Sequence, residues 1–229
     1  MIEVTLIDSM GTDLSTVNAA RVSFNKKSKL VKTGTVTIED ADGYVYEEPQ
    51  YGLNKKDSKL VSYLAEHKHI SPFGHSAASF YVKAPVFVAR QLVKHKFLRW
   101  NEISRRYVDE EPDFYTPDIW RGRSADKKQG SEGTISISDD IVEDLYDDAV
   151  ARYRLLLEIG VCPEQARMVL PQSMMTEWYW TGSLDAFASM CNLRCTEDTQ
   201  YESRVVADRI DEEMYILFPK TWDALRGND

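Results

Sequence analysis

The segment "KHKFLRWNEISRRY", residues 94–107, concentrates positive charge: it holds five Lys or Arg and a single acid, Glu102. From Lys83 to Arg106 there are seven Lys or Arg, although the whole chain has a formal net charge of −9. Guanidinium, hydroxyl and backbone N–H groups are the donors that bind phosphate. Two or three charge-assisted hydrogen bonds, each about 1.5–3 kcal/mol, hold a nucleotide monophosphate at micromolar strength after the cost of association. The segment predicts a site for a small anionic ligand; the alternative is that its cations only keep one face solvated or pair with the acids of "DEEPD" (109–113).

The composition excludes several other classes of function. A pI near 5.1 argues against a general nucleic-acid binder, which presents a broad basic surface. No apolar run approaches the roughly 20 residues that span a bilayer, so we expect no membrane segment. The opening "MIEVTLIDSM" has no basic leader and no long apolar region, and an odd count of three cysteines fits a reducing compartment. We therefore expect a cytoplasmic protein.

No pattern predicts a metal site. Cys191 and Cys195 lie four residues apart on an expected helix, and we interpret them as small core residues instead of a metal or redox pair. His67, His69 and His75 fall within nine residues, but residues 67 and 69 do not share a helical face. The acids that open the helix expected from residue 138 suit its dipole and solvent.

Helices and scattered strands alternate along the chain and must position the basic segment. This pattern predicts an α+β fold in one domain, residues 1–229. We expect a small, mainly antiparallel sheet flanked by long helices. Strands are expected where apolar residues alternate, at 2–8, 76–84 and 174–182, and helices where they recur at helical spacing. These helices are expected at 13–24, 55–69, 84–96, from 138 through 156, 163–171, 183–194 and 197–218.

Three segments have their own expectations. Residues 33–48 form two β-prone runs around Asp42-Gly43, which predicts a hairpin, interpreted as an insertion. Residues 97–107 show no clean period and predict a loop. Residues 121–136 are polar and rich in Gly and Ser, so we expect a mobile surface loop.

At this point the residues resemble the flavin-dependent thymidylate synthases. That family carries Arg-His-Arg, seven variable residues, Ser, one residue and Arg; here the matching positions are Lys94-His95-Lys96, Ser104 and Arg106. The likeness extends along most of the chain in further blocks that stand in the family's order: "AARVSF" (19–24), "SPFGH" (71–75), "KAPVFVARQ" (83–91), "ARMVLP" (166–171) and "NLR" (192–194).

The resemblance implies reductive methylation of dUMP to dTMP. Methylenetetrahydrofolate would provide the carbon, and NADPH the hydride through FAD. The uracil ring must become nucleophilic, and no cysteine here has a base beside it in sequence to attack the ring. By family position the catalytic group is Arg194, whose fixed charge favours ionisation of the ring nitrogen between the two carbonyls. The family also implies a homotetramer with sites shared between subunits.

The resemblance assigns site residues by position. Those expected to bind dUMP are Gln91, Leu92, Val93, Lys94, Glu102, Ile103, Ser104, Arg105, Arg106, Arg167 and Arg194, with Ser104 and Arg106 placed for the phosphate. Those expected to bind FAD are Ser23, His69, Ser71, Lys94, His95, Lys96, Glu102, Ser183, Asp185 and Ser189. Without the family, Arg167 could pair with Glu164, and Arg194 could complement a helix dipole.

The flavin side departs from the family pattern. Two arginines have become Lys94 and Lys96, which keeps the charge but loses the bidentate fork. Arg99, Gly74 and Asp185 also replace the usual residues. These changes leave two alternatives open: folate-dependent hydroxymethylation of a deoxypyrimidine nucleotide, in which water intercepts the adduct before hydride arrives, or an inactive nucleotide-binding homologue.

Overall fold

The computed structural model describes residues 1–108, 110–125, 130–138 and 140–227. Its centre is a four-stranded sheet in the order β1 (Glu3–Met10), β4 (Ala77–Pro85), β8 (Met175–Ser183) and β5 (Leu98–Glu102). Each neighbouring pair in this sheet is antiparallel. The prediction of an α+β chain with a small antiparallel sheet is confirmed.

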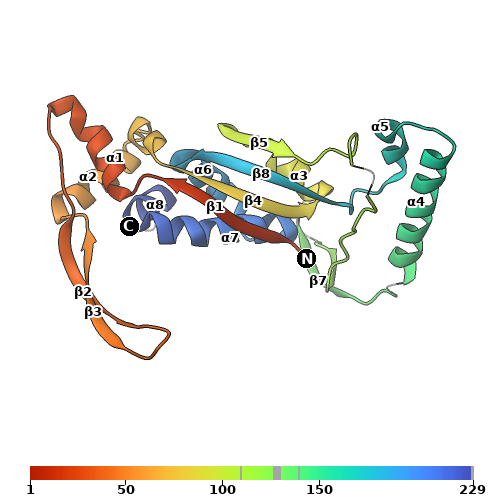
Figure 1. Ribbon diagram of the computed structural model, residues 1–229, viewed down its shortest axis with the longest axis horizontal. Coiled ribbons are helices and arrows are strands. Elements are labelled where there is room, and N and C mark those ends of the chain that lie inside the picture. Colours follow the sequence, from red (N-terminus) through yellow and green to blue (C-terminus); the bar gives the residue numbers. More distant parts are fainter. Residues whose placement is uncertain (109, 126–129, 139, 228–229) are drawn as a thin grey trace.

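Helices cover one face of this sheet. Figure 1 shows α6 (Leu184–Arg194), α7 (Tyr201–Leu217) and α8 (Pro219–Arg226) along that face. Alternate residues of β4 point into the resulting core, where Phe80 meets the ring of Phe187 edge to face at 5.3 Å. Burial of each such side chain contributes about 1.5–3 kcal/mol. The remaining helices are α1 (Asp13–Arg21), η1 (Val22–Phe24), α2 (Lys55–Glu66), η2 (Ser71–His75), α3 (Val86–Leu92), α4 (Asp140–Glu158), α5 (Pro163–Ala166) and η3 (Arg167–Val169).

The expectation of a loop over residues 97–107 is wrong for its first half. Strand β5 pairs with β8 and places Trp100 opposite Trp180. The Trp100 ring stacks on Trp178 with centroids 4.4 Å apart, which gives the strand an apolar anchor. Half-buried Leu98 and Trp100 do alternate with exposed Arg99 and Asn101, but the alternation is too short to mark a strand by itself.

Residues 33–48 lie within a hairpin, as predicted, and its strands β2 (Val31–Glu39) and β3 (Val45–Gly52) extend beyond those bounds. Gly43 has a φ of +81° in the turn, a conformation that favours glycine. Figure 1 shows the hairpin projecting away from the main sheet. Its origin as an insertion stays a prediction.

The loop predicted at 121–136 is instead bounded by paired strands, β6 (Trp120–Arg123) and β7 (Ser131–Ile135); residues 126–129 lie outside the described part. Arg121 anchors β6 by donating to Ser131 Oγ at 2.9 Å and to Glu202 on α7, contacts that composition does not reveal. Among the described helices, none is both long and apolar enough to cross a bilayer.

Candidate active site

The turn that carries the basic segment is held at both ends. It follows α3 and enters β5 through Phe97, which has a left-handed φ of +65°, uncommon for a residue other than glycine. At Gly182 on β8 a Cβ atom would lie 2.2 Å from Leu98 Cδ2 and 3.3 Å from the Phe97 carbonyl oxygen, so a larger residue there would require the Leu98 side chain to move. The backbone of Lys94, His95 and Lys96 is therefore fixed between a helix end and a strand.

Two cavities adjoin this turn. Cavity A, of about 760 Å³, and cavity B, of about 560 Å³, share Lys94, Leu193 and Arg194. Cavity A is further lined by Gln91, Arg121, Gly130, Ser131, Thr196, Asp198, Thr199 and Gln200. Cavity B is further lined by Ile70, His95, Lys96, Phe97, Asp185, Ala186 and Ser189. Arg194 lies at the wall between them, and it is the residue to which the family resemblance assigns the catalytic role.

Arg194 is oriented by a histidine. Its Nε donates to His95 Nε2 at 3.0 Å, so that ring nitrogen accepts and carries no proton. Burial and the nearby positive charge of Arg194 lower the pKa of His95 from 6.5 to about 4. His95 is neutral at physiological pH and leaves the Arg194 charge uncompensated. No other hydrogen bond to the Arg194 side chain is found among the described residues, so its terminal N–H groups are available to a ligand.

Gln91 is fixed in cavity A by two neighbours on the segment that opens α7. Ser203 Oγ donates to Gln91 Oε1 at 3.1 Å, and Gln91 Nε2 donates to Gln200 Oε1. Gln200 Nε2 in turn donates to Glu202 at 3.2 Å. The orientation of the Gln91 amide is thereby set before any ligand arrives.

Arg121 is a cavity residue that the sequence did not reveal. It makes a bidentate contact with Glu202, at 2.7 and 2.9 Å, and Glu202 is only 4% exposed. The Arg121 guanidinium also lies 4.9 Å from the centre of the Tyr201 ring. The contact joins residues 81 positions apart, and no local signal in the sequence marks it.

A third cavity, cavity C of about 1110 Å³, holds a second group of the predicted flavin residues. Ser23, His69 and Ser71 line it, and Ile70 lines both cavity C and cavity B. Four lysines also line it: Lys26, Lys56, Lys59 and Lys68. The residues predicted for FAD therefore divide between two cavities joined at Ile70.

Other predicted residues do not line cavities A, B or C in a single chain. Glu102 accepts from Trp100 Nε1 at 3.0 Å and from Thr176 at 2.7 Å, and Arg167 Nε donates to the Glu164 carbonyl at 3.2 Å. Leu92 lies in the core. The others in this group are Val93, Ile103, Ser104, Arg105, Arg106 and Ser183.

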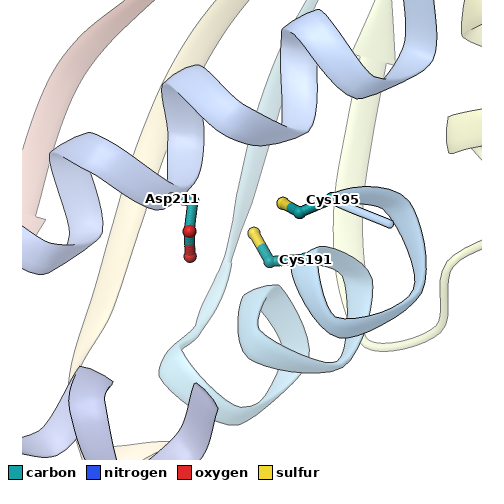
Figure 2. Close-up of side chains that lie close together, drawn as sticks. All are labelled: Cys191, Cys195 and Asp211. Carbon is teal, nitrogen blue, oxygen red and sulfur yellow. The ribbon is translucent and has the colours of Figure 1, made fainter. Parts of the chain in front are cut away.

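Cys191, Cys195 and Asp211 form one grouping with ligand atoms within 4.8 Å of one another (Figure 2). The Asp211 carboxylate already accepts from Trp222 Nε1 at 2.8 Å and from Arg226 Nε at 2.7 Å. Burial raises the pKa of the Cys191 thiol, which disfavours the thiolate that binds metals. We therefore interpret the grouping as a packing contact between the end of α6 and α7, with Asp211 also tied to α8, and assign it no metal.

Comparison with known proteins gives a consistent result. The family described as "Thymidylate synthase complementing protein" matches residues 5–220. The chain is 36% identical over 223 residues to a flavin-dependent thymidylate synthase of Thermus thermophilus (96% of this chain, 74% of that protein) and 37% identical over 224 residues to one of Thermosipho melanesiensis (96% and 88%). The crystal structure of a UMP/dUMP methylase, PolB from Streptomyces cacaoi, bound with 5-Br dUMP, superimposes with a TM-score of 0.77 at 29% identity, covering 99% of this chain and 95% of that one.

Proposed function

This chain belongs to the family of flavin-dependent thymidylate synthases, and from that premise we propose that it methylates dUMP to dTMP. The observation that carries the proposal is Arg194, hydrogen-bonded to a neutral His95 at the wall between cavities A and B. The relative solved with a bound dUMP analogue supports the choice of nucleotide. Methylenetetrahydrofolate is proposed as the carbon donor and NADPH as the reductant.

Arg194 activates the pyrimidine in this proposal. With cavity A holding the nucleotide, the free guanidinium N–H groups face the uracil and stabilise negative charge on the ring, which makes its carbon five nucleophilic. An arginine keeps its charge at any working pH, and a neutral His95 does not compete for it. The residues that line cavities A and B include no cysteine, so an attacking thiol has no position there.

The other residues of cavity A bind and orient the nucleotide. The Gln91 amide is held by Ser203 and Gln200 and can read the edge of the base. Lys94 and Arg121 add positive charge to the cavity. A half-buried, pre-oriented amide favours a base whose edge pairs with its remaining N–H group, and this contributes to specificity for the pyrimidine.

Cavity B fits a flavin in its chemistry. Ile70, Phe97, Ala186 and Leu193 supply apolar surface for a ring system, and the polar groups proposed to hold its edge are Lys94, His95, Lys96, Asp185 and Ser189. When bound, FAD supplies the hydride that completes the methyl group. The task of the chain is to place the two ligands on either side of Arg194 and to keep His95 unprotonated.

We infer that the complete site needs more than one subunit, and we propose a homotetramer. Arg106, Tyr107 and Arg167 are exposed in the single chain and do not line its cavities, although the family assigns Arg106 and Arg167 to the nucleotide. The Tyr107 side chain is 78% exposed, and Met168, next to Arg167, is 79% exposed. A partner subunit would cover this apolar surface.

The function is tested by the mass of the product. The purified protein, which should show flavin absorbance, is incubated with dUMP, methylenetetrahydrofolate and NADPH, and the nucleotide is analysed by mass spectrometry. The expected product carries a methyl group and appears only when all three substrates are present. A hydroxymethyl product, or unchanged dUMP with a flavin-loaded protein, would refute the proposal.

A further inference from the structure

The hairpin formed by β2 and β3 packs against no other part of its own chain. Its strands pair with each other, and among the described elements neither strand has more than marginal contact with any other element. Every residue from Val45 to Tyr51 is exposed, and Figure 1 shows the hairpin projecting away from the rest of the chain. A two-stranded hairpin by itself is only marginally stable in water, so this one needs a surface to pack on.

One face of the hairpin is apolar. Residues directly opposite each other share a face, and the register pairs Val36 with Glu48 and Ile38 with Tyr46. The Tyr44 ring stacks on Tyr46 with centroids 6.4 Å apart. Val36 is 36% exposed, Tyr44 69% and Tyr46 40%. Exposed apolar surface gathered in this way marks a site of protein–protein contact.

The outer half of the hairpin is strongly acidic. Residues 39–48, "EDADGYVYEE", contain five acids and no Lys or Arg. The Asp40 carboxylate accepts hydrogen bonds from the backbone N–H groups of Asp42 and Tyr44, which holds the turn. Within the described part of the chain, none of the five acids takes part in an ion pair. A surface that covers this hairpin must therefore be basic, which argues against nucleic acid and anionic membranes as partners.

Strand β5 offers a surface of that kind. Arg99 is exposed on this strand and takes part in no ion pair among the described residues. Phe97, two residues earlier, is 83% exposed, and Tyr179, on the same face of the neighbouring strand β8, is 51% exposed. Among the described strands β5 has a single neighbour, so its outer edge is open. A cation flanked by exposed aromatic rings complements an apolar face bordered by acids.

We propose that the hairpin of one subunit docks on β5 of a second copy of this chain. Its apolar face packs against Phe97 and Tyr179 of the second copy, and its acids surround Arg99 there. The contact forms between chains because the hairpin and β5 of one chain are well separated in Figure 1. A second copy is the favoured partner because this chain carries both complementary surfaces, and a reciprocal exchange of hairpins closes a dimer.

The inference goes beyond the proposed function, since it requires self-association but not the reaction. It also gives one explanation for two departures from the family pattern. The hairpin is interpreted as an insertion, and Arg99 replaces the family's usual residue. In the docked arrangement the added hairpin supplies the acids that Arg99 lacks within its own chain.

The test exchanges the charges of the two surfaces and measures association without substrates. Variant X is Glu47→Lys with Glu48→Lys, which makes the hairpin basic. Variant Y is Arg99→Glu, which makes the β5 surface acidic. The full-length proteins are followed by sedimentation velocity over a series of concentrations, each alone, mixed in equal amounts, and as the triple variant that carries all three changes.

Each charge variant has a matched control on another surface. Glu143→Lys with Asp144→Lys reverses two adjacent exposed acids on α4, and Arg123→Glu reverses an exposed arginine on β6. The apolar face is tested by Tyr46→Thr. Its control is Thr37→Ser, because Thr37 pairs with Glu47 on the opposite face of the hairpin.

The expected result is that X and Y alone each raise the subunit dissociation constant at least about tenfold, because each places like charges opposite one another. The mixture of X and Y and the triple variant should return to about the parent value, since opposite charges meet again in both, and this recovery excludes misfolding as the cause of the loss. Tyr46→Thr should weaken association, whereas Thr37→Ser and both charge controls should equal the parent.

A monomeric parent, or unchanged association of X and Y, overturns the proposal. So does an equal loss in the charge controls, or a failure of both the mixture and the triple variant to recover. A protein that associates through the hairpin but forms no dTMP would disprove the proposed function alone.

Discussion

Arg194 and His95 are joined by a 3.0 Å hydrogen bond in which the guanidinium donates and the imidazole accepts. The pair links the C-terminal turn of α6 to the turn after α3, and so ties two segments 99 residues apart. Protonation of His95 would replace this bond by repulsion between two cations. The pair therefore makes the geometry of the candidate catalytic group dependent on the protonation state of one imidazole.

The stability of the protein should fall with acidification through this imidazole. The pKa of His95 is lowered from 6.5 to about 4 in the folded chain, so between these values the unfolded state binds more protons. Its contribution is fully present above pH 6.5 and is lost as the pH falls from 6.5 through about 4. We expect urea midpoints of the parent to decline over this window more steeply than those of His95→Asn. The imidazole signals in an NMR titration should move near pH 4.

The same NMR titration can separate the two causes of the lowered His95 pKa. In Arg194→Ala the neighbouring cation is gone, so the pKa of His95 should rise, but only part of the way, because burial is the larger cause. A His95 that titrates near 6.5 in the parent would show that the ring is not held neutral.

Arg194→Ala should remove most of the activity. With the guanidinium absent, Lys94 is the one cation left among the described residues that line both cavities, and it lacks the planar fork that faces the ring, so turnover should drop by about 10²–10³-fold or more. The measurement is dTMP formation under saturating dUMP. Arg152→Ala serves as the control, because Arg152 pairs with Asp148 on the exposed side of α4. Undiminished dTMP formation in Arg194→Ala would exclude the assigned role.

Glu202→Gln should weaken the fold. Glu202 is buried and receives two hydrogen bonds from Arg121 and one from Gln200, so neutralising it leaves Arg121 without its counter-ion. Loss of a charged hydrogen bond predicts an unfolding free energy about 1.5–3 kcal/mol lower. Urea denaturation checks this value, with Glu212→Gln, exposed on the same helix, as control. Equal midpoints for the two variants would show that the pair adds nothing to stability.

The local spacing of apolar residues predicted the main helices and strands of the fold. The long helix expected at 197–218 is α7, Tyr201–Leu217, because its apolar residues recur at helical spacing over many turns. The strand expected at 174–182 is β8, where Trp178 and Trp180 are buried and Tyr179 is exposed. The spacing of apolar residues within a single segment shows which face of that segment is buried, so such elements can be predicted from local sequence alone.

The parts that could not be predicted depend on contacts between distant segments. The Gln91–Gln200 pair joins residues 109 positions apart; the family block at 83–91 marks Gln91, but no pattern marks Gln200 or the contact between them. Strand β5 is set by its partner β8 and by tryptophan stacking, while its own sequence is largely polar. Helix α8 was not expected at all; its Trp222 and Arg226 are fixed by Asp211 on α7. The sequence therefore gives the kinds of residue available to the site, whereas their arrangement depends on the tertiary structure.

Restoring the family's arginines should strengthen the flavin site. Lys94 and Lys96 line cavity B, and each presents a single point charge where a guanidinium would offer a planar fork to a phosphate or a ring edge. For Lys94→Arg with Lys96→Arg we expect FAD to bind about tenfold more tightly, the effect of roughly 1.4 kcal/mol, measured by the quenching of flavin fluorescence. Lys27→Arg with Lys55→Arg, at exposed positions outside cavities A, B and C, controls for a general effect of arginine. Asp185 also lines cavity B and already accepts from Ser183 at 2.6 Å; if the new arginines pair with its carboxylate instead of with the cofactor, FAD affinity will stay constant or fall, and the assignment of these two lysines to the flavin will be wrong.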